Sequence, residues 1–300
     1  MGWITDRWSR GWSMARGSWS VLKRHPKLAL FPAVSGLALF LALGLMTVSL
    51  IAGTGFLYAL TGWNFDDFGA DWRSEVVMFV GAFLVLYVLT TIAVFFNTAL
   101  VFCTLEAYSG KDPSIRSGLH GAVGCLPQIL GWALVAASVG MLLNAIEGFL
   151  SDKLGIVGEI IGALFNTGWA AATYLVLPVL AVERTGPLTA VRRSSAILRS
   201  KWGESIAGDI RISLIGVLFV LQALLVFFVG FALEGAYAGS MGFVGIFLMA
   251  VGVLYGVAAV IVLLALSAMF KTAVYLYATT GKVPSGLDAA LVAGAFRAKA

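Results

Sequence analysis

The side chains that most often carry chemistry in proteins are scarce in this sequence. It contains two histidines, His25 and His120, and two cysteines, Cys103 and Cys125. Metal sites and hydrolytic centres need histidine, cysteine and carboxylate groups at set spacings. No such spacing is present, and there is no hydrolase, dinucleotide or phosphate-loop motif. We therefore expect no metal, no cofactor and no enzymatic activity.

Polar side chains inside apolar runs are the remaining candidates, because such groups are costly in lipid and are often functional there. The five candidates are Asn97, Asn144, Glu147, Asn166 and Gln222. They could line a polar path, or they could hydrogen-bond between helices for about 0.6 kcal/mol each. Asn97 and Asn166 stand at matching places in two Phe-Asn-Thr-small elements, so both amides should face the inside of a bundle. We favour the structural interpretation.

The elements that must position these residues are membrane-spanning helices. Of the 300 residues 60% are hydrophobic and 12% are charged, and a soluble domain carries roughly twice as much charge. A spanning helix needs about 20 apolar residues. Six runs reach that length, at residues 33–60, 76–105, 128–150, 155–182, 212–236 and 242–275. The expected fold is an all-α polytopic membrane protein in a single domain over residues 1–300.

The distribution of lysine and arginine predicts the orientation of the chain. Eighteen of the 20 basic residues fall on the same side of the six runs as the N-terminus, and only Arg73 and Lys153 fall on the other side. Cytoplasmic connections of membrane proteins carry the excess of basic residues. We therefore expect both termini in the cytoplasm and the protein in the cell membrane.

Two basic segments are expected to contact anionic lipid. Before the first run, Trp8, Trp12 and Trp19 recur at helical spacing on one face, and three arginines accompany them, namely Arg7, Arg10 and Arg16. Tryptophan on the apolar side and arginine on the polar side are typical of a helix in the membrane interface. After the fourth run comes a second group, Arg192, Arg193, Arg199 and Lys201. Nearby apolar helices favour lipid, or the setting of topology, over nucleic acid as its partner.

Short sequence elements recur where three of the runs end on the cytoplasmic side. The second and sixth runs end in AYSGKDPS (residues 107–114) and ATTGKVPS (residues 278–285), and the fourth ends in ERTGP (residues 183–187). Each is followed by a helix-like stretch. The recurrence predicts three units, each an interfacial amphipathic helix followed by a transmembrane hairpin, over about 1–108, 109–182 and 183–278. Residues 279–300 would form a cytoplasmic helix or tail.

Glycines four residues apart predict close helix contacts, since small residues let helices approach in lipid. The pairs are Gly158/Gly162, Gly235/Gly239 and Gly252/Gly256. Packing within the chain is favoured, and a homo-oligomer through these faces stays open as the alternative.

Residues 177–204, 17–36 and 95–101 together resemble an uncharacterised prokaryotic family of six-helix membrane proteins, known only as a domain of unknown function. The resemblance covers nearly the whole chain and implies a bacterial or archaeal cell membrane. More loosely, the layout is similar to the membrane domain attached to some glycerophosphodiester phosphodiesterases, whose soluble catalytic domain has no counterpart here.

These observations favour one function class over two others. The first is a non-enzymatic membrane protein that organises or senses the inner leaflet through its basic, tryptophan-rich interfacial helices. The alternative is a small transporter or channel, oligomeric or not, with a polar path near Asn97 and Asn166. A lipid enzyme is disfavoured because the sequence offers no nucleophile, base or metal-ligand set.

The orientation can be tested with single cysteines. Asp67→Cys and Lys153→Cys should label with an impermeant reagent added to intact cells, because both positions are expected outside. Ser200→Cys should not label. Outside labelling at position 200 would overturn the orientation.

Overall fold

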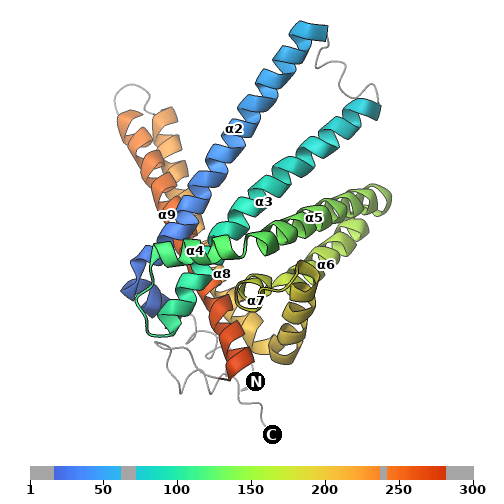
Figure 1. The fold of residues 1–300 in the computed structure, drawn as a ribbon. Coiled ribbons are helices and arrows are strands. Elements are labelled where there is room, and N and C mark those ends of the chain that lie inside the picture. The colour runs from blue at the N-terminus through green and yellow to red at the C-terminus, as the bar shows by residue number, and fades with distance from the viewer. Residues whose placement is uncertain (1–16, 62–71, 237–241, 282–300) are drawn as a thin grey trace. The chain divides into compact units, whose positions relative to one another are not determined.

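A computed structural model describes residues 17–61, 72–236 and 242–281, which form helices and turns, with no strand among them (Figure 1). Residues 17–24 are helical. The elements that follow are η1 (Pro26–Ala29), α2 (Leu30–Thr61), α3 (Trp72–Tyr108), α4 (Ile115–Gly124), α5 (Leu126–Leu154), α6 (Ile156–Thr173), α7 (Val176–Glu183), α8 (Pro187–Ala236) and α9 (Gly242–Thr280). The predicted all-α class is confirmed.

Six segments are long and apolar enough to cross a membrane, as predicted. They are Pro26–Gly53, Glu75–Tyr108, Leu126–Leu154, Ile156–Glu183, Ser213–Gly235 and Phe243–Thr280. The chain divides into two compact units. One comprises Met1–Ala33, Leu100–Gly118 and Ile197–Ala300, and the other comprises Val34–Ala99 and Leu119–Ala196.

Buried side chains gather at those ends of the spanning segments that the basic residues mark as cytoplasmic. In α9, Met269, Phe270 and Val274 are fully buried, whereas Phe243 and Leu254 are 77% and 69% exposed. A long apolar helix with an exposed half needs an apolar solvent for that half. Lipid supplies it, so these exposed apolar side chains need no protein partner.

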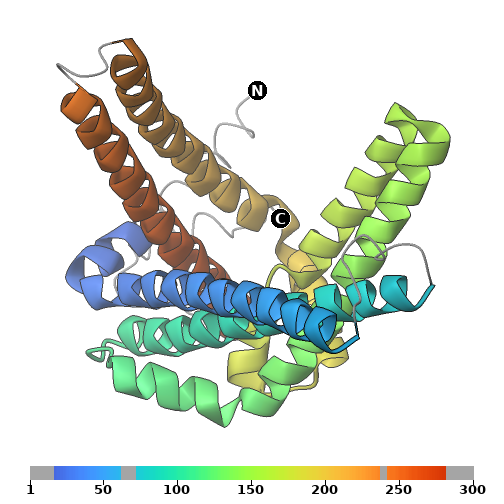
Figure 2. The same cartoon turned by 90° about the horizontal axis from the view of Figure 1, so that it is seen from above.

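Within the second unit, α5 and α6 run side by side as an antiparallel pair (Figure 1; Figure 2). Gly155 makes the turn with a φ of +56°, a value that glycine adopts without strain. A Cβ atom on Gly162 would lie 2.7 Å from Cγ of Glu147, and one on Gly158 would collide with the Leu150 carbonyl. The predicted pair Gly158/Gly162 therefore packs within the chain. Trp132 and Trp169 stack between the same helices, with ring centroids 6.0 Å apart.

The fourth spanning segment, predicted as one run, is interrupted at Tyr174 and Leu175, between α6 and α7. Pro178 explains the break, because proline lacks an N–H and its ring collides with the carbonyl four residues earlier. At the interruption, the Leu175 N–H donates to the buried hydroxyl of Ser194, at 2.9 Å.

Within the first unit, α8 and α9 approach through glycines (Figure 2). A Cβ atom on Gly230 would lie 2.6 Å from the Gly245 carbonyl oxygen, and one on Gly252 would lie 2.8 Å from the Phe227 nitrogen. The predicted pair Gly252/Gly256 packs here. Gly235 has no neighbour of this kind within 4 Å, and its predicted partner Gly239 lies outside the described residues.

One predicted interfacial helix, the helix-like stretch that follows the ERTGP exit, differs from expectation. The segment Pro187–Trp202 is the first part of α8, which continues to Ala236, and is no separate helix. No proline follows Pro187 until Pro284, so nothing removes a backbone donor and the helix runs on. The segment after the second span does form a separate helix, α4, which ends before Pro127. Residues 2–16 and 282–300 lie outside the described part of the chain.

Close packing of α8 on α9 predicts a matched pair of substitutions. Gly230→Ala should lower the free energy of unfolding by about 1–3 kcal/mol, because the added methyl group overpacks the interface. Gly235→Ala, on the same helix but with open space around its Cβ position, should leave stability unchanged or raised. Thermal unfolding in detergent measures both, and equal midpoints would contradict the packing.

Candidate functional site

Three spanning segments end in the same backbone conformation on the side predicted to be cytoplasmic. Gly110 after α3, Arg184 after α7 and Gly281 after α9 have φ values of +77°, +49° and +66°. A left-handed residue is a common end for a helix. In each case a proline stands three residues further along the sequence, at Pro113, Pro187 and Pro284. In the sequence, Gly186 of the ERTGP motif suggests itself as the counterpart of Gly110 and Gly281, but the left-handed conformation identifies Arg184 as the true counterpart.

The sequence also contains three Phe-x-Thr elements, which end at Thr98, Thr167 and Thr272. Their distances to the left-handed residues are not constant. Thr98 lies 12 residues before Gly110, Thr167 lies 17 before Arg184, and Thr272 lies 9 before Gly281. Asn97 and Asn166, which precede the first two threonines, therefore stand at different distances from the exits of their helices. Their resemblance is local in sequence only.

The two asparagines have different partners, and both are half-buried. The Asn97 amide donates to the Ala93 carbonyl of its own helix at 2.8 Å. The Asn166 amide donates to the Glu147 carboxylate at 2.7 Å and so joins α6 to α5. The structure thus brings together two of the five predicted polar candidates. Asn144 is exposed, and Gln222 accepts a hydrogen bond from the Tyr255 hydroxyl at 3.0 Å, between α8 and α9.

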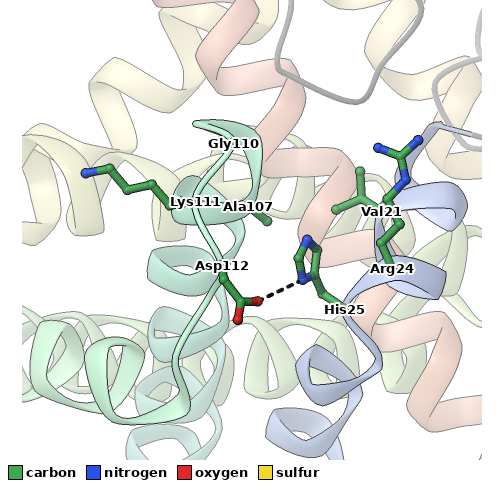
Figure 3. A pocket seen from close by; sticks show the side chains of 7 residues that line it. All are labelled: Val21, Arg24, His25, Ala107, Gly110, Lys111 and Asp112. Carbon is green, nitrogen blue, oxygen red and sulfur yellow. Dashed lines mark ion pairs between the residues drawn. The ribbon is translucent and has the colours of Figure 1, made fainter.

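A cleft of about 330 Å³ lies between the helix over residues 17–24 and the turn that follows α3 (Figure 3). We call it the His25 cleft; it is lined by Val21, Arg24, His25, Ala107, Gly110, Lys111 and Asp112. Its two walls belong to one compact unit. Sequence reasoning missed it, because its halves are far apart in the chain and only tertiary contact joins them.

Buried hydrogen bonds hold the helix wall in place. The Tyr108 hydroxyl, at the end of α3, donates to the Met269 carbonyl of α9 at 3.2 Å. A tyrosine has one hydroxyl proton, so the Ser18 hydroxyl is the donor to Tyr108, at 3.4 Å. Ser18 is fully buried and Tyr108 nearly so. The short helix is thereby joined to two spanning helices.

Glu106 organises the other wall. Its backbone carbonyl accepts the Lys111 N–H at 3.0 Å. Its carboxylate accepts the Ser114 N–H at 3.3 Å and the Ser117 hydroxyl. One side chain thus ties the end of α3 to the start of α4 and keeps the Gly110–Pro113 turn closed. The cleft is a preformed feature of the fold.

The cleft has charged groups of both signs. His25 Nδ1 lies 3.3 Å from the Asp112 carboxylate, whose side chain is 80% exposed, so this pair contributes little to stability. Arg24 and Lys111 extend on either side of the pair (Figure 3), and neither forms an ion pair with another described residue. With His25 neutral, the cleft carries one net positive charge.

The predicted lipid-contact residues lie partly within the described chain. Trp19 is 41% exposed, and the Lys23 ammonium lies 5.3 Å from its ring centroid. Arg192, Arg193 and Arg199 are exposed, and Arg193 pairs with Glu183 at 3.1 Å. The side chains that lie outside the described part are Arg7, Trp8, Arg10, Trp12, Arg16 and Lys201.

Both cysteines are buried and free. Burial raises the pKa of the Cys125 thiol above its ordinary value, and the nearby Arg184 guanidinium offsets part of that rise. A buried thiol with a raised pKa is a poor nucleophile. Across the described residues, no three histidine, cysteine or carboxylate side chains gather as a metal site would require.

The different partners of Asn97 and Asn166 predict that their substitution lowers the free energy of unfolding by different amounts. Asn166→Leu removes the donor to a carboxylate and should lower the free energy of unfolding by about 1.5–3 kcal/mol. Asn97→Leu removes a bond within one helix and should cost about 1 kcal/mol. In the background of Glu147→Leu, Asn166→Leu should cost less, because no carboxylate is left without its donor. Equal losses for the two single variants, measured by unfolding in detergent, would contradict the assignment.

Comparison with known proteins gives one family. The family of unknown function DUF6159 matches residues 76–285, well over half of the chain. No curated protein and no solved structure matches, so the looser similarity to a phosphodiesterase membrane domain stays a prediction. The matched range includes the turn that carries Lys111 and Asp112 and five of the six spanning segments in whole or large part. The expected resemblance to an uncharacterised family is confirmed: the chain belongs to DUF6159.

Proposed function

We propose that this protein is a non-enzymatic integral membrane protein of a prokaryotic cell membrane that organises or senses the cytoplasmic leaflet. It would do so through short helical segments that contact anionic lipid. The observation that carries the proposal is the surface of these segments. Basic side chains, together with several large apolar ones, are left exposed beside the ends of the spanning segments.

Helix α4 shows this division most clearly. Gly118 and Ala122 are buried, whereas Ile115 and Val123 are 37% and 56% exposed. Arg116 on the same helix is exposed as well. A helix that buries its small residues and exposes its large apolar ones suits a position in the interface, with the exposed apolar face toward the acyl chains.

The first turns of α8 and the helical residues 17–24 also expose basic side chains, although their buried faces include larger apolar residues. In α8, Ser194 and Ile197 are buried while Arg192 and Arg199 are exposed. In the first helix, Val21 and Leu22 are buried, and Trp19 and Lys23 are exposed. Each basic residue near an anionic leaflet contributes about 1 kcal/mol of attraction. Several of them together supply a preference for anionic lipid.

The proposed layout has both termini in the cytoplasm and three transmembrane hairpins, each preceded by an interfacial segment. Its support is the uneven division of basic residues and the shared left-handed exits at Gly110, Arg184 and Gly281. In the third unit the interfacial segment is continuous with the fifth spanning helix. The three units would therefore share the order of their elements but differ in whether a turn separates the interfacial segment from the spanning helix.

The conduit alternative has weaker support. A polar path needs groups that can exchange their partners with water or with a passing ion. Asn97 is hydrogen-bonded within its helix, and Asn166 is hydrogen-bonded to Glu147. Amides with protein partners favour a structural role.

Spin-labelled lipids test the proposal on the full chain in nanodiscs. Labelled phosphatidylglycerol should be more strongly immobilised than labelled phosphatidylcholine. The difference should shrink with salt, because the Debye length falls from about 10 Å at 0.1 M to about 3 Å at 1 M. Equal immobilisation of the two lipids at low salt would contradict the proposal.

Two charge-neutralising variants refine that test. Arg192→Gln with Arg199→Gln should reduce the preference for phosphatidylglycerol, since both side chains are exposed. Arg73→Gln with Lys153→Gln removes the same number of charges. Both of these positions have acidic residues nearby in sequence (Asp71, Glu75 and Asp152), so this control should leave the preference unchanged.

A further inference from the structure

We propose that the His25 cleft holds the phosphate of an anionic lipid headgroup, with Arg24 and Lys111 as its ligands. The inference rests on the proposed function and deepens it, because it assigns one specific site within an otherwise diffuse contact with lipid.

The cleft lies at headgroup depth. The first spanning segment begins at Pro26, directly after His25, and the second ends at Tyr108, two residues before Gly110. The walls of the cleft therefore lie at the ends of two spanning segments. The exposed Trp19 on the same short helix is the side chain typical of that depth.

The charges and size of the cleft suit a phosphodiester. An arginine guanidinium binds phosphate oxygens with two parallel hydrogen bonds, and a lysine ammonium adds a compact charge. The net charge of +1 matches the single negative charge of such a headgroup. A volume of about 330 Å³ is within the range of small-ligand sites. Arg24 and Lys111 are long and exposed, so each can turn over the His25–Asp112 pair toward a common anion.

The helix ends act against an anion. The 17–24 helix and α3 both point their C-termini at the cleft, and the partial negative charge there attracts the two basic side chains themselves. Each end carries roughly half an elementary charge, against two full positive charges on the side chains. The balance favours anion binding, but a role of Arg24 and Lys111 in stabilising helix ends is the competing account that a test must separate.

A phosphate in the cleft could come from a lipid or from solution. Val21 and Ala107 give the cleft an apolar part, and the adjoining helices lead directly into the hydrocarbon. Acyl chains can therefore lie against the helices while the phosphate sits between the bases. A free phosphate would gain nothing from those surfaces, and this is why we assign the site to lipid.

Native mass spectrometry of the full chain in detergent counts retained lipid. Wild-type protein should retain one phosphatidylglycerol in preference to phosphatidylcholine. Arg24→Gln with Lys111→Gln should weaken that retention about tenfold or more, since two charge-assisted contacts are lost. Lys27→Gln with Lys153→Gln removes two exposed bases that do not line the cleft, and should change retention by less than about twofold.

A gain-of-binding variant covers the case in which the double variant folds poorly. Asp112→Asn removes the one negative charge in the cleft and should strengthen retention of phosphatidylglycerol by about threefold or more. Unchanged or weakened retention by Asp112→Asn overturns the proposal.

The other outcomes are equally clear. A double variant of lower thermal stability and unchanged retention would show that the two bases only stabilise helix ends, which overturns the proposal. Displacement of the lipid by millimolar inorganic phosphate would assign the site to free phosphate and overturn it too. The preference of the wild-type chain for spin-labelled phosphatidylglycerol reports the diffuse contact with lipid separately. The assignment of a lipid site to the His25 cleft can therefore be contradicted while the proposed function stands.

Discussion

Everything in this fold depends on one constraint: a backbone that crosses lipid must satisfy its own hydrogen bonds, because no water is available to do so. Six uninterrupted or nearly uninterrupted helices meet it. The exception confirms how strictly it applies. Where the fourth spanning segment is interrupted between α6 and α7, the Leu175 N–H donates to the buried Ser194 hydroxyl, from a helix that follows it in the chain.

The same solvent explains where the protein packs and where it does not. Lipid is as apolar as the helices, so burial of leucine gives no driving force between them, and contact relies on close backbone approach at glycine. Gly230 and Gly245 permit that approach between α8 and α9, as Gly158 and Gly162 do between α5 and α6. Large apolar side chains can remain exposed over half a helix. The large buried side chains gather at the ends that the basic residues mark as cytoplasmic, and the contacts elsewhere are made mostly by glycine.

The helix ends that the basic residues mark as cytoplasmic also carry the left-handed turns and the candidate site. A left-handed residue ends three of the spanning segments, and the turn after α3 forms one wall of the His25 cleft. The buried Ser18, Tyr108 and Met269 contacts fix the other wall. The best-defined side-chain contacts of the candidate site thus lie at the ends of the spanning segments.

The number of spanning helices, their class and the division of basic residues could all be read from the sequence, because hydrophobic runs and charge counts are local properties. Membership of an uncharacterised family was also foreseen. Tertiary structure alone decided the rest. It paired Asn166 with Glu147 and left Asn97 to its own helix. It placed the left-handed turn at Arg184 rather than at Gly186, and it joined Arg24 and His25 to Lys111 and Asp112 in one cleft. Each of these depends on which residues far apart in the chain come into contact, and periodicity along one segment carries no information about that.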